Sequence, residues 1–164
     1  MTLRVDVPAG KDPVTWVWTQ SVPGIAPAAT AFSNAVYADS TIPLREFEAA
    51  RTRIAQINQC RFCLDWRTER DGERVEEGFY DEVAGWRTSA ALTERERLAA
   101  ALAERFAVDH LGMDDDEVFW KELRGAYSDT ELLELTLCIG SWVAFGRLNH
   151  VFGLDTACVL PKAE

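Results

Sequence analysis

Residues 48–68 read EAARTRIAQINQCRFCLDWRT, and their spacing is the most informative in the chain. Apolar residues recur there, and just before it, at three- and four-residue steps: Phe47, Ala50, Ile54 and Ile57. This spacing is typical of the buried face of an α-helix, and Pro43 suits the first helical position because its fixed backbone angle is already helical. Asn58-Gln59 interrupts the pattern, so we expect a turn there and a further helix from Cys60 to about Arg70, where Asp71-Gly72 ends it.

Helical spacing continues on both sides of this stretch. Five further helices are predicted: one from near Pro27, one over Glu76–Val83, one after Thr93, one over Asp115–Arg124 and one after Ser128. Thr93 and Ser128 are each followed three residues later by a glutamate, which is the pattern of a helix capping box. No run of residues alternates between apolar and polar as a half-buried strand would. The sequence therefore predicts an all-α fold, a single helical bundle of about six or seven helices.

The length of 164 residues suits one domain. Proline and glycine punctuate residues 1–23, which we expect to form an irregular N-terminal arm. The helical domain is expected over residues 24–154, and residues 155–164 are expected to form a C-terminal tail.

Composition narrows the possible partners and compartment. Lys and Arg number 17 and Asp and Glu number 27, which gives a net charge of −10 and disfavours nucleic acid and anionic membranes as partners. The first residues lack the apolar segment of a secretory signal. The longest nearly uncharged run, residues 135–146, is too short to span a bilayer. We therefore expect a cytoplasmic protein that binds neither nucleic acid nor membrane.

Cys60 and Cys63 are the clearest candidates for chemistry. Two thiols three residues apart can close a short disulfide, and a helix N-terminus together with Arg61 favours the reactive thiolate. A thiolate attacks peroxide oxygens and disulfide sulfurs. The competing interpretation is that both cysteines are small buried apolar residues. A zinc site would need two more ligands, and the sequence offers no second CxxC and no HxxxH, so we expect no metal.

Glu48 and Arg67 are candidates because of the predicted turn. If the helices before and after Asn58-Gln59 fold back antiparallel, Glu48 faces Arg67, and Cys63 lies one helical turn from Arg67. The three side chains then converge. The alternatives are a solvent-facing Glu48, and an Arg67 that forms a structural ion pair with Glu48 or Asp65.

These residues also carry a family resemblance. A glutamate followed twelve positions later by a CxxC pair, with the flanking segments 53–58, 128–136 and 146–149, resembles the alkylhydroperoxidase D and carboxymuconolactone decarboxylase-like family over roughly residues 24–154. The resemblance implies an all-α domain that assembles as a homo-oligomer, often a trimer or hexamer. It implies no metal and no organic cofactor.

The resemblance further implies a thiol peroxidase or disulfide reductase. Cys63 would be oxidised by a hydroperoxide, and Cys60 would act as proton donor and then close a disulfide. Glu48 would be the base at the far end of a proton relay. An external dithiol or reductase protein would regenerate the thiols. The family's relay histidine is replaced by Arg67, and arginine stays protonated and cannot shuttle a proton.

This replacement keeps other functions open. The chain could be a non-catalytic family member that binds a ligand, with Glu48 and Arg67 paired across the old site. It could also be a lyase or isomerase in which Arg67 holds a small carboxylic acid. His150 could stand in for the missing histidine, although a position at a helix end predicts a structural role for it. We expect Cys138 to be a core residue and Cys158 to lie in the tail.

Overall fold

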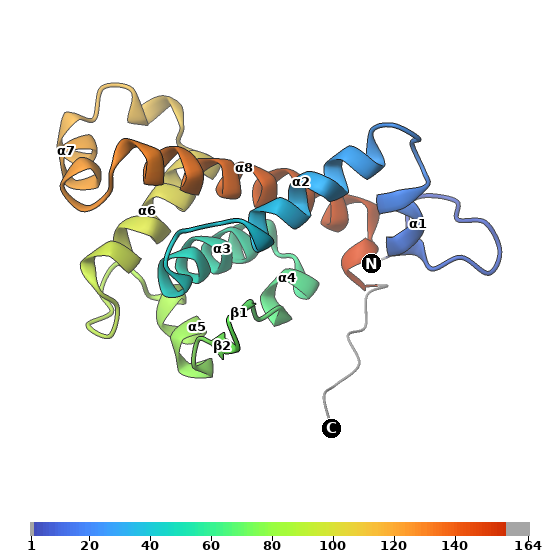
Figure 1. Ribbon diagram of the computed structural model, residues 1–164, viewed down its shortest axis with the longest axis horizontal. Helices are drawn as coiled ribbons and strands as arrows, with labels where there is room; N and C mark the ends of the chain where they lie inside the picture. The colour runs from blue at the N-terminus through green and yellow to red at the C-terminus, as the bar shows by residue number, and fades with distance from the viewer. Residues whose placement is uncertain (1, 157–164) are drawn as a thin grey trace.

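Helix α3 (Leu44–Asn58) lies at the centre of the fold (Figure 1). The structure is a computed structural model, and it describes residues 2–156. Ten of its fifteen residues are buried, so it contacts neighbours on most sides. It packs against α6 (Glu94–Val108), α8 (Asp129–Phe152) and α5 (Glu77–Ala84). Phe47 on α3 is fully buried, and its ring meets that of Trp142 on α8 edge to face with centroids 4.8 Å apart. The predicted helical bundle is confirmed.

The long helix α8 runs along the bundle, and shorter helices cover its ends (Figure 1). Helix α2 (Ala26–Ala38) packs against α8, and α1 (Pro13–Thr19) packs against α2 near the N-terminus. Helix α7 (Glu117–Ala126) lies at the other end, against α6. Two 3₁₀ turns complete the helical elements, at Leu111–Met113 and Leu154–Thr156.

Both predicted capping boxes are present. The Glu96 backbone N–H donates to the Thr93 hydroxyl at 3.2 Å, and the Thr93 N–H donates to the Glu96 carboxylate at 2.8 Å. Ser128 and Glu131 form the same reciprocal pair at the start of α8. These bonds satisfy backbone donors that have no partner within the helix, which fixes where α6 and α8 begin.

The helix predicted from Cys60 to about Arg70 is wrong in its extent. Helix α4 (Arg61–Asp65) ends at Asp65, and a two-stranded hairpin follows, β1 (Glu69–Arg70) and β2 (Glu73–Arg74). Asp71 and Gly72 both have positive φ, 55° and 80°, as a tight hairpin turn requires. The expectation that the chain has no strand is therefore also wrong, because strands of two residues are too short to show an alternating pattern.

Two further expectations need correction. The N-terminal arm is not wholly irregular, because Pro13–Thr19 form α1, whose first turn is capped by the Asp12 carboxylate accepting from the Thr15 N–H at 2.8 Å. With α1 added to the predicted helices, residues 2–156 contain eight α-helices, one more than the upper end of the predicted six or seven. No helix in this part of the chain is long and apolar enough to cross a membrane. Cys158 lies outside the described residues.

Candidate active site at the cysteine pair

Cys60 and Cys63 are joined by a disulfide, with their Cα atoms 5.2 Å apart. The turn predicted at Asn58-Gln59 brings them into position, because Gln59 adopts the left-handed conformation that ends α3. Cys60 then caps α4, and its Sγ accepts from the Cys63 backbone N–H at 3.3 Å. Cys60 is fully buried, whereas Cys63 is half-buried and lies in the wall of a cavity. The two sulfurs therefore differ in access.

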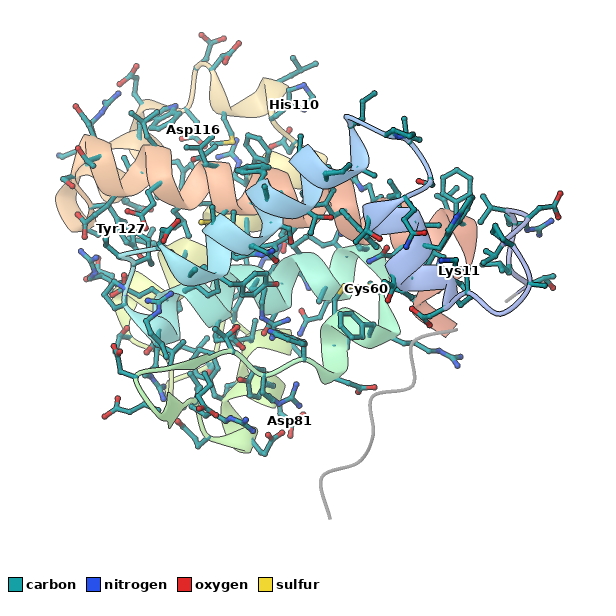
Figure 2. All side chains as sticks on the ribbon, turned by 45° about the vertical axis from the view of Figure 1, so that its right-hand side comes forward. Lys11, Cys60, Asp81, His110, Asp116 and Tyr127 are labelled. Atoms are coloured by element: carbon teal, nitrogen blue, oxygen red, sulfur yellow. A yellow bond between two sulfur atoms is a disulfide. The ribbon has the colours of Figure 1, made fainter. Side chains whose placement is uncertain are left out.

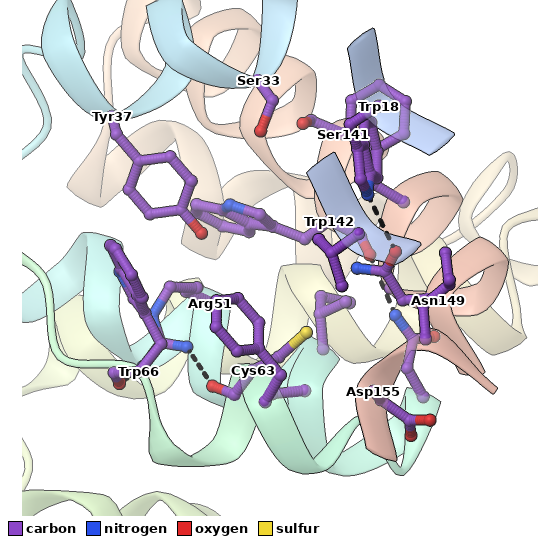
Figure 3. Close-up of a pocket in the computed structure, with 18 of the residues that line it drawn as sticks. Trp18, Ser33, Tyr37, Arg51, Cys63, Trp66, Ser141, Trp142, Asn149 and Asp155 are labelled. Atoms are coloured by element: carbon purple, nitrogen blue, oxygen red, sulfur yellow. Dashed lines mark hydrogen bonds between the residues drawn. The ribbon is translucent and has the colours of Figure 1, made fainter. Parts of the chain in front are cut away.

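The cavity has a volume of about 590 Å³, and several large aromatic side chains contribute to its wall (Figure 3). Six aromatic residues from four helices and the end of α4 contribute to its wall: Trp18, Tyr37, Phe62, Trp66, Trp142 and Phe145. Helix α1 closes one side, where Trp18 Nε1 donates to Asn149 Oδ1 of α8 at 3.1 Å. The lining contains two residues with charged side chains, Arg51 and Asp155. A cavity of this size and character suits an organic molecule of moderate size.

Glu48 is fully buried beside this site and accepts four hydrogen bonds. Arg51 donates twice, from Nε at 2.6 Å and from Nη2 at 2.8 Å. The Thr68 and Tyr80 hydroxyls donate at 2.6 and 2.9 Å. Each carboxylate oxygen therefore accepts two bonds, which leaves little capacity to take up a proton from a further group.

Arg51 connects this carboxylate to the cysteine-bearing turn. Its Nη1 donates to the carbonyl oxygen of Cys63 at 2.6 Å, and its Nη2 donates to that of Trp66 at 3.0 Å. Burial opposes the charged form of Arg51, but the hydrogen bonds and negative charge of Glu48 prevail, so the pKa of Arg51 is raised. The buried ion pair thus ties α4 to α3 at the position of Cys63.

Arg67 does not form the predicted ion pair with Glu48 or Asp65. Its guanidinium donates to Glu77 of α5 at 2.9–3.0 Å and to the Leu64 carbonyl at 2.7 Å. The Glu77 carboxylate raises the pKa of Arg67. Because α4 ends at Asp65, the chain is already extended at Trp66, and Thr68 takes the place opposite Glu48.

Tyr80 lies between Glu48 and Arg67 and keeps them apart. Its hydroxyl donates to Glu48, while the Arg67 guanidinium lies over its ring, 3.9 Å from the centroid. Burial and the charge of Glu48 raise the pKa of Tyr80. Of the four predicted site residues, Cys60 and Cys63 are joined directly, Glu48 reaches Cys63 through Arg51, and Arg67 lies outside the cavity lining.

Sequence reasoning missed Arg51, Thr68 and Tyr80. The spacing of Glu48 and Arg51, three residues apart on one helix, is visible in the sequence and is a known ion-pair spacing. The spacing alone could not show that both side chains are buried. Thr68 and Tyr80 carry no sequence signal, because their position depends on how the chain packs after α4.

Cys138 and the two histidines are not part of the cavity lining. Cys138 is buried in the core as predicted, and burial raises the pKa of its thiol to about 11. His150 Nδ1 is 3.1 Å from Asp155 Oδ2 near the end of α8, which fits the predicted structural position. Figure 2 shows His110 and Asp116 well away from Cys60. Within residues 2–156, no three His, Cys, Asp or Glu side chains gather as a metal site would require.

The chain was compared with known families, proteins and structures. The Carboxymuconolactone decarboxylase family pattern matches residues 23–105. The uncharacterized protein YnjA of Escherichia coli (strain K12) is 32% identical over 115 residues, 67% of this chain, and the chain spans 61% of that protein's length. A crystal structure from Agrobacterium tumefaciens superposes with a TM-score of 0.67 at 24% identity, covering 80% of this chain and 90% of the other. That protein is described as one of unknown function with a proposed role in antioxidant defence as AhpD, and the likeness bears out the fold.

Proposed function

Because this chain belongs to the carboxymuconolactone decarboxylase family, we propose that it is a thiol-dependent oxidoreductase that reduces hydroperoxides or protein disulfides through Cys60 and Cys63. One observation carries the proposal. A bonded cysteine pair lies beside a cavity of about 590 Å³, with Cys63 in the cavity wall. A dithiol in that position can be oxidised by a molecule bound in the cavity and then reduced again by thiol exchange.

The proposed reaction begins with reduced protein. The Cys63 thiolate attacks the terminal oxygen of a hydroperoxide, the O–O bond breaks, and the alkoxide leaves. Cys63 is then a sulfenic acid. The Cys60 thiol displaces its hydroxyl, so that the disulfide forms and water is released. An external dithiol or reductase protein returns the pair to the thiol state and is itself oxidised to a disulfide.

Cys63 takes the first role because of access. It lines the cavity, whereas Cys60 is fully buried behind it. Helix α4 has five residues, so its dipole contributes little to thiolate formation. Arg51 contacts this turn through its Nη1, which is bonded to the Cys63 carbonyl oxygen, but its charge is balanced by Glu48. This arrangement supports a thiolate less strongly than an unpaired cation would.

We assign Glu48 a structural role in place of the relay base that the resemblance implies. All four of its acceptor positions are occupied, two of them by Arg51. A relay from Glu48 through position 67 has no support, because Arg67 is directed to Glu77. Glu48 instead keeps Arg51 charged and oriented, and Arg51 holds the turn that carries Cys63.

The chain is further proposed to act as a homo-oligomer, a trimer or hexamer as the family resemblance implies. Leu133 and Leu137 lie one turn apart on α8 and are 68% and 62% exposed. A second copy of the chain could cover these apolar side chains. The oligomeric state is measured by sedimentation equilibrium, and a monomer at micromolar concentration would contradict this part of the proposal.

Ligand binding without catalysis is the second candidate function. The full hydrogen bonding of Glu48 and the aromatic lining of the cavity favour it. The lyase or isomerase in which Arg67 clamps a carboxylic acid loses its support, because Arg67 is bonded to Glu77 and is not part of the lining. A free-thiol titration against pH separates the two candidates, since inert thiols of ordinary pKa favour ligand binding.

The proposed activity is tested by following tert-butyl hydroperoxide consumption with dithiothreitol as reductant. The wild-type protein is compared with Cys63→Ser and with Cys138→Ala as the matched control, since Cys138 is a buried core thiol that is not part of the cavity lining. We expect turnover in the wild type and in Cys138→Ala and none in Cys63→Ser. Unchanged turnover in Cys63→Ser would overturn the proposal.

A further inference from the structure

We propose that Tyr37 is the general acid of the peroxide reaction, donating its phenolic proton to the alkoxide that leaves when Cys63 attacks. This inference rests on the proposed function and adds the residue that replaces the missing proton relay. Tyr37 lies on α2 and lines the same cavity as Cys63. It lies 23 residues before Cys60, and no local sequence pattern connects it to the cysteine pair.

The reaction needs a proton donor inside the cavity. Cleavage of the O–O bond leaves an alkoxide, a strong base that must be protonated before it departs into solvent. Cys60, the donor that the resemblance implies, is fully buried and is not part of the cavity lining. Glu48 already accepts four hydrogen bonds, and Arg67 is turned to Glu77.

The geometry of Tyr37 suits this role. Its ring is held by three aromatic neighbours, with centroids 5.7 Å from Phe47, 6.0 Å from Trp66 and 6.5 Å from Trp142. Packing on this scale fixes the ring without occupying its hydroxyl. Figure 3 shows the hydroxyl directed into the cavity, on the side where Arg51 and Cys63 lie.

The surroundings keep the proton on Tyr37 and stabilise the anion that its transfer leaves. Burial raises the pKa of Tyr37 to about 12, and the nearby Glu48 and Cys138 add to this rise. Arg51 and the Trp142 N–H lower the same pKa, but by less than burial raises it. Tyr37 is therefore neutral at physiological pH. Trp142 also lines the cavity, and its buried Nε1 makes no hydrogen bond to any other group, so it is available to stabilise a tyrosinate at position 37.

The proposed step conserves atoms and charge. The Cys63 thiolate takes the terminal hydroxyl of the hydroperoxide and becomes a sulfenic acid, and the electron pair of the O–O bond passes to the leaving oxygen. That alkoxide takes the Tyr37 proton and leaves as an alcohol. The tyrosinate that remains recovers a proton from water entering the cavity, so Tyr37 is unchanged after one turnover.

Leaving-group dependence tests this role and separates it from a structural one. Pre-reduced protein, freed of reductant, is mixed with tert-butyl hydroperoxide or with peracetic acid, and disulfide formation is followed by quenched alkylation and mass spectrometry. The first oxidant releases an alkoxide that needs a proton, whereas the second releases acetate, which does not. We expect Tyr37→Phe to lower the rate constant with tert-butyl hydroperoxide by about 100-fold, which is at the lower end of the usual contribution of general acid catalysis. The rate constant with peracetic acid is expected to stay unchanged.

Tyr127→Phe is the matched control, because it removes a buried hydroxyl that donates to the Arg95 carbonyl outside the cavity. This control is expected to leave both rates unchanged. Equal effects of Tyr37→Phe on the two oxidants, or no effect on either, would overturn the inference. A wild-type protein that forms no disulfide with either oxidant would instead overturn the proposed function, so the two failures are distinguishable.

Discussion

Arg51 and Glu48 form a buried ion pair with two hydrogen bonds, from Arg51 Nε to Glu48 Oε1 at 2.6 Å and from Arg51 Nη2 to Glu48 Oε2 at 2.8 Å. The two side chains are only 2% and 0% exposed. Arg51 also holds the carbonyl of Cys63, so one buried guanidinium joins the carboxylate to the redox turn. The residue that resembles the family's relay base thus acts here as an anchor.

Glu48→Gln is expected to destabilise the protein strongly. The substitution leaves the Arg51 charge buried without its counterion, and breaking a buried pair in this way costs about 3–5 kcal/mol. The free energy of unfolding is measured by urea denaturation followed by circular dichroism. Glu77→Gln is the control, since Glu77 pairs with Arg67 at the surface and such pairs contribute up to about 1 kcal/mol. Similar losses in the two variants would contradict the buried anchor.

Arg67→His is expected not to raise the peroxide reaction rate. It restores the family residue at this position, but the side chain lies outside the cavity lining and faces Glu77. Single-turnover disulfide formation with tert-butyl hydroperoxide measures the effect. A clear rate increase would show that position 67 reaches the reacting atoms and that our placement of it is wrong.

Cys60→Ser is expected to trap the first oxidation product on Cys63. Without the second thiol the sulfenic acid cannot close the disulfide, so it persists and reacts with dimedone. Peptide mass spectrometry after hydroperoxide treatment locates the adduct. Cys63→Ser treated in the same way is expected to give no adduct on Cys60, which is fully buried. An adduct on Cys60 alone would reverse the two roles.

Cys138 is expected to resist alkylation in the folded protein at neutral and mildly alkaline pH. Burial raises the pKa of this thiol to about 11, so at pH 8 roughly one molecule in a thousand carries the reactive thiolate. Reactivity then increases only as pH rises toward 11. Iodoacetamide labelling with mass spectrometry tests this, and labelling in urea is the control. Rapid modification of Cys138 in native protein at pH 8 would contradict its placement in the core.

Local sequence signals were sufficient for most helices. The capping glutamates after Thr93 and Ser128 bond to backbone groups within their own helix turn, so their effect needs no distant contact. The turn at Asn58-Gln59 is likewise local, since Gln59 alone adopts the left-handed conformation that ends α3. These features were predicted and are confirmed.

The arrangement around Cys63 depends on distant contacts and could not be predicted in the same way. Helix α4 ends early where Arg51, on another helix, binds the carbonyls of Cys63 and Trp66. That early end directs Arg67 to Glu77 and brings Thr68 to Glu48. The cavity is lined by residues from five α-helices, α1 to α4 and α8, which lie far apart in the sequence. Its lining therefore has no single sequence pattern.

The most direct test of the central claim is to measure Cys63 alkylation against pH in reduced protein, and disulfide formation on adding hydroperoxide, both by iodoacetamide trapping and mass spectrometry. We predict that Cys63 reacts as a thiolate below the ordinary thiol value of about 8.5, and that hydroperoxide converts the reduced pair into a Cys60–Cys63 disulfide. An ordinary pKa for Cys63, with both thiols still free after hydroperoxide treatment, would contradict the redox function and favour ligand binding in the cavity.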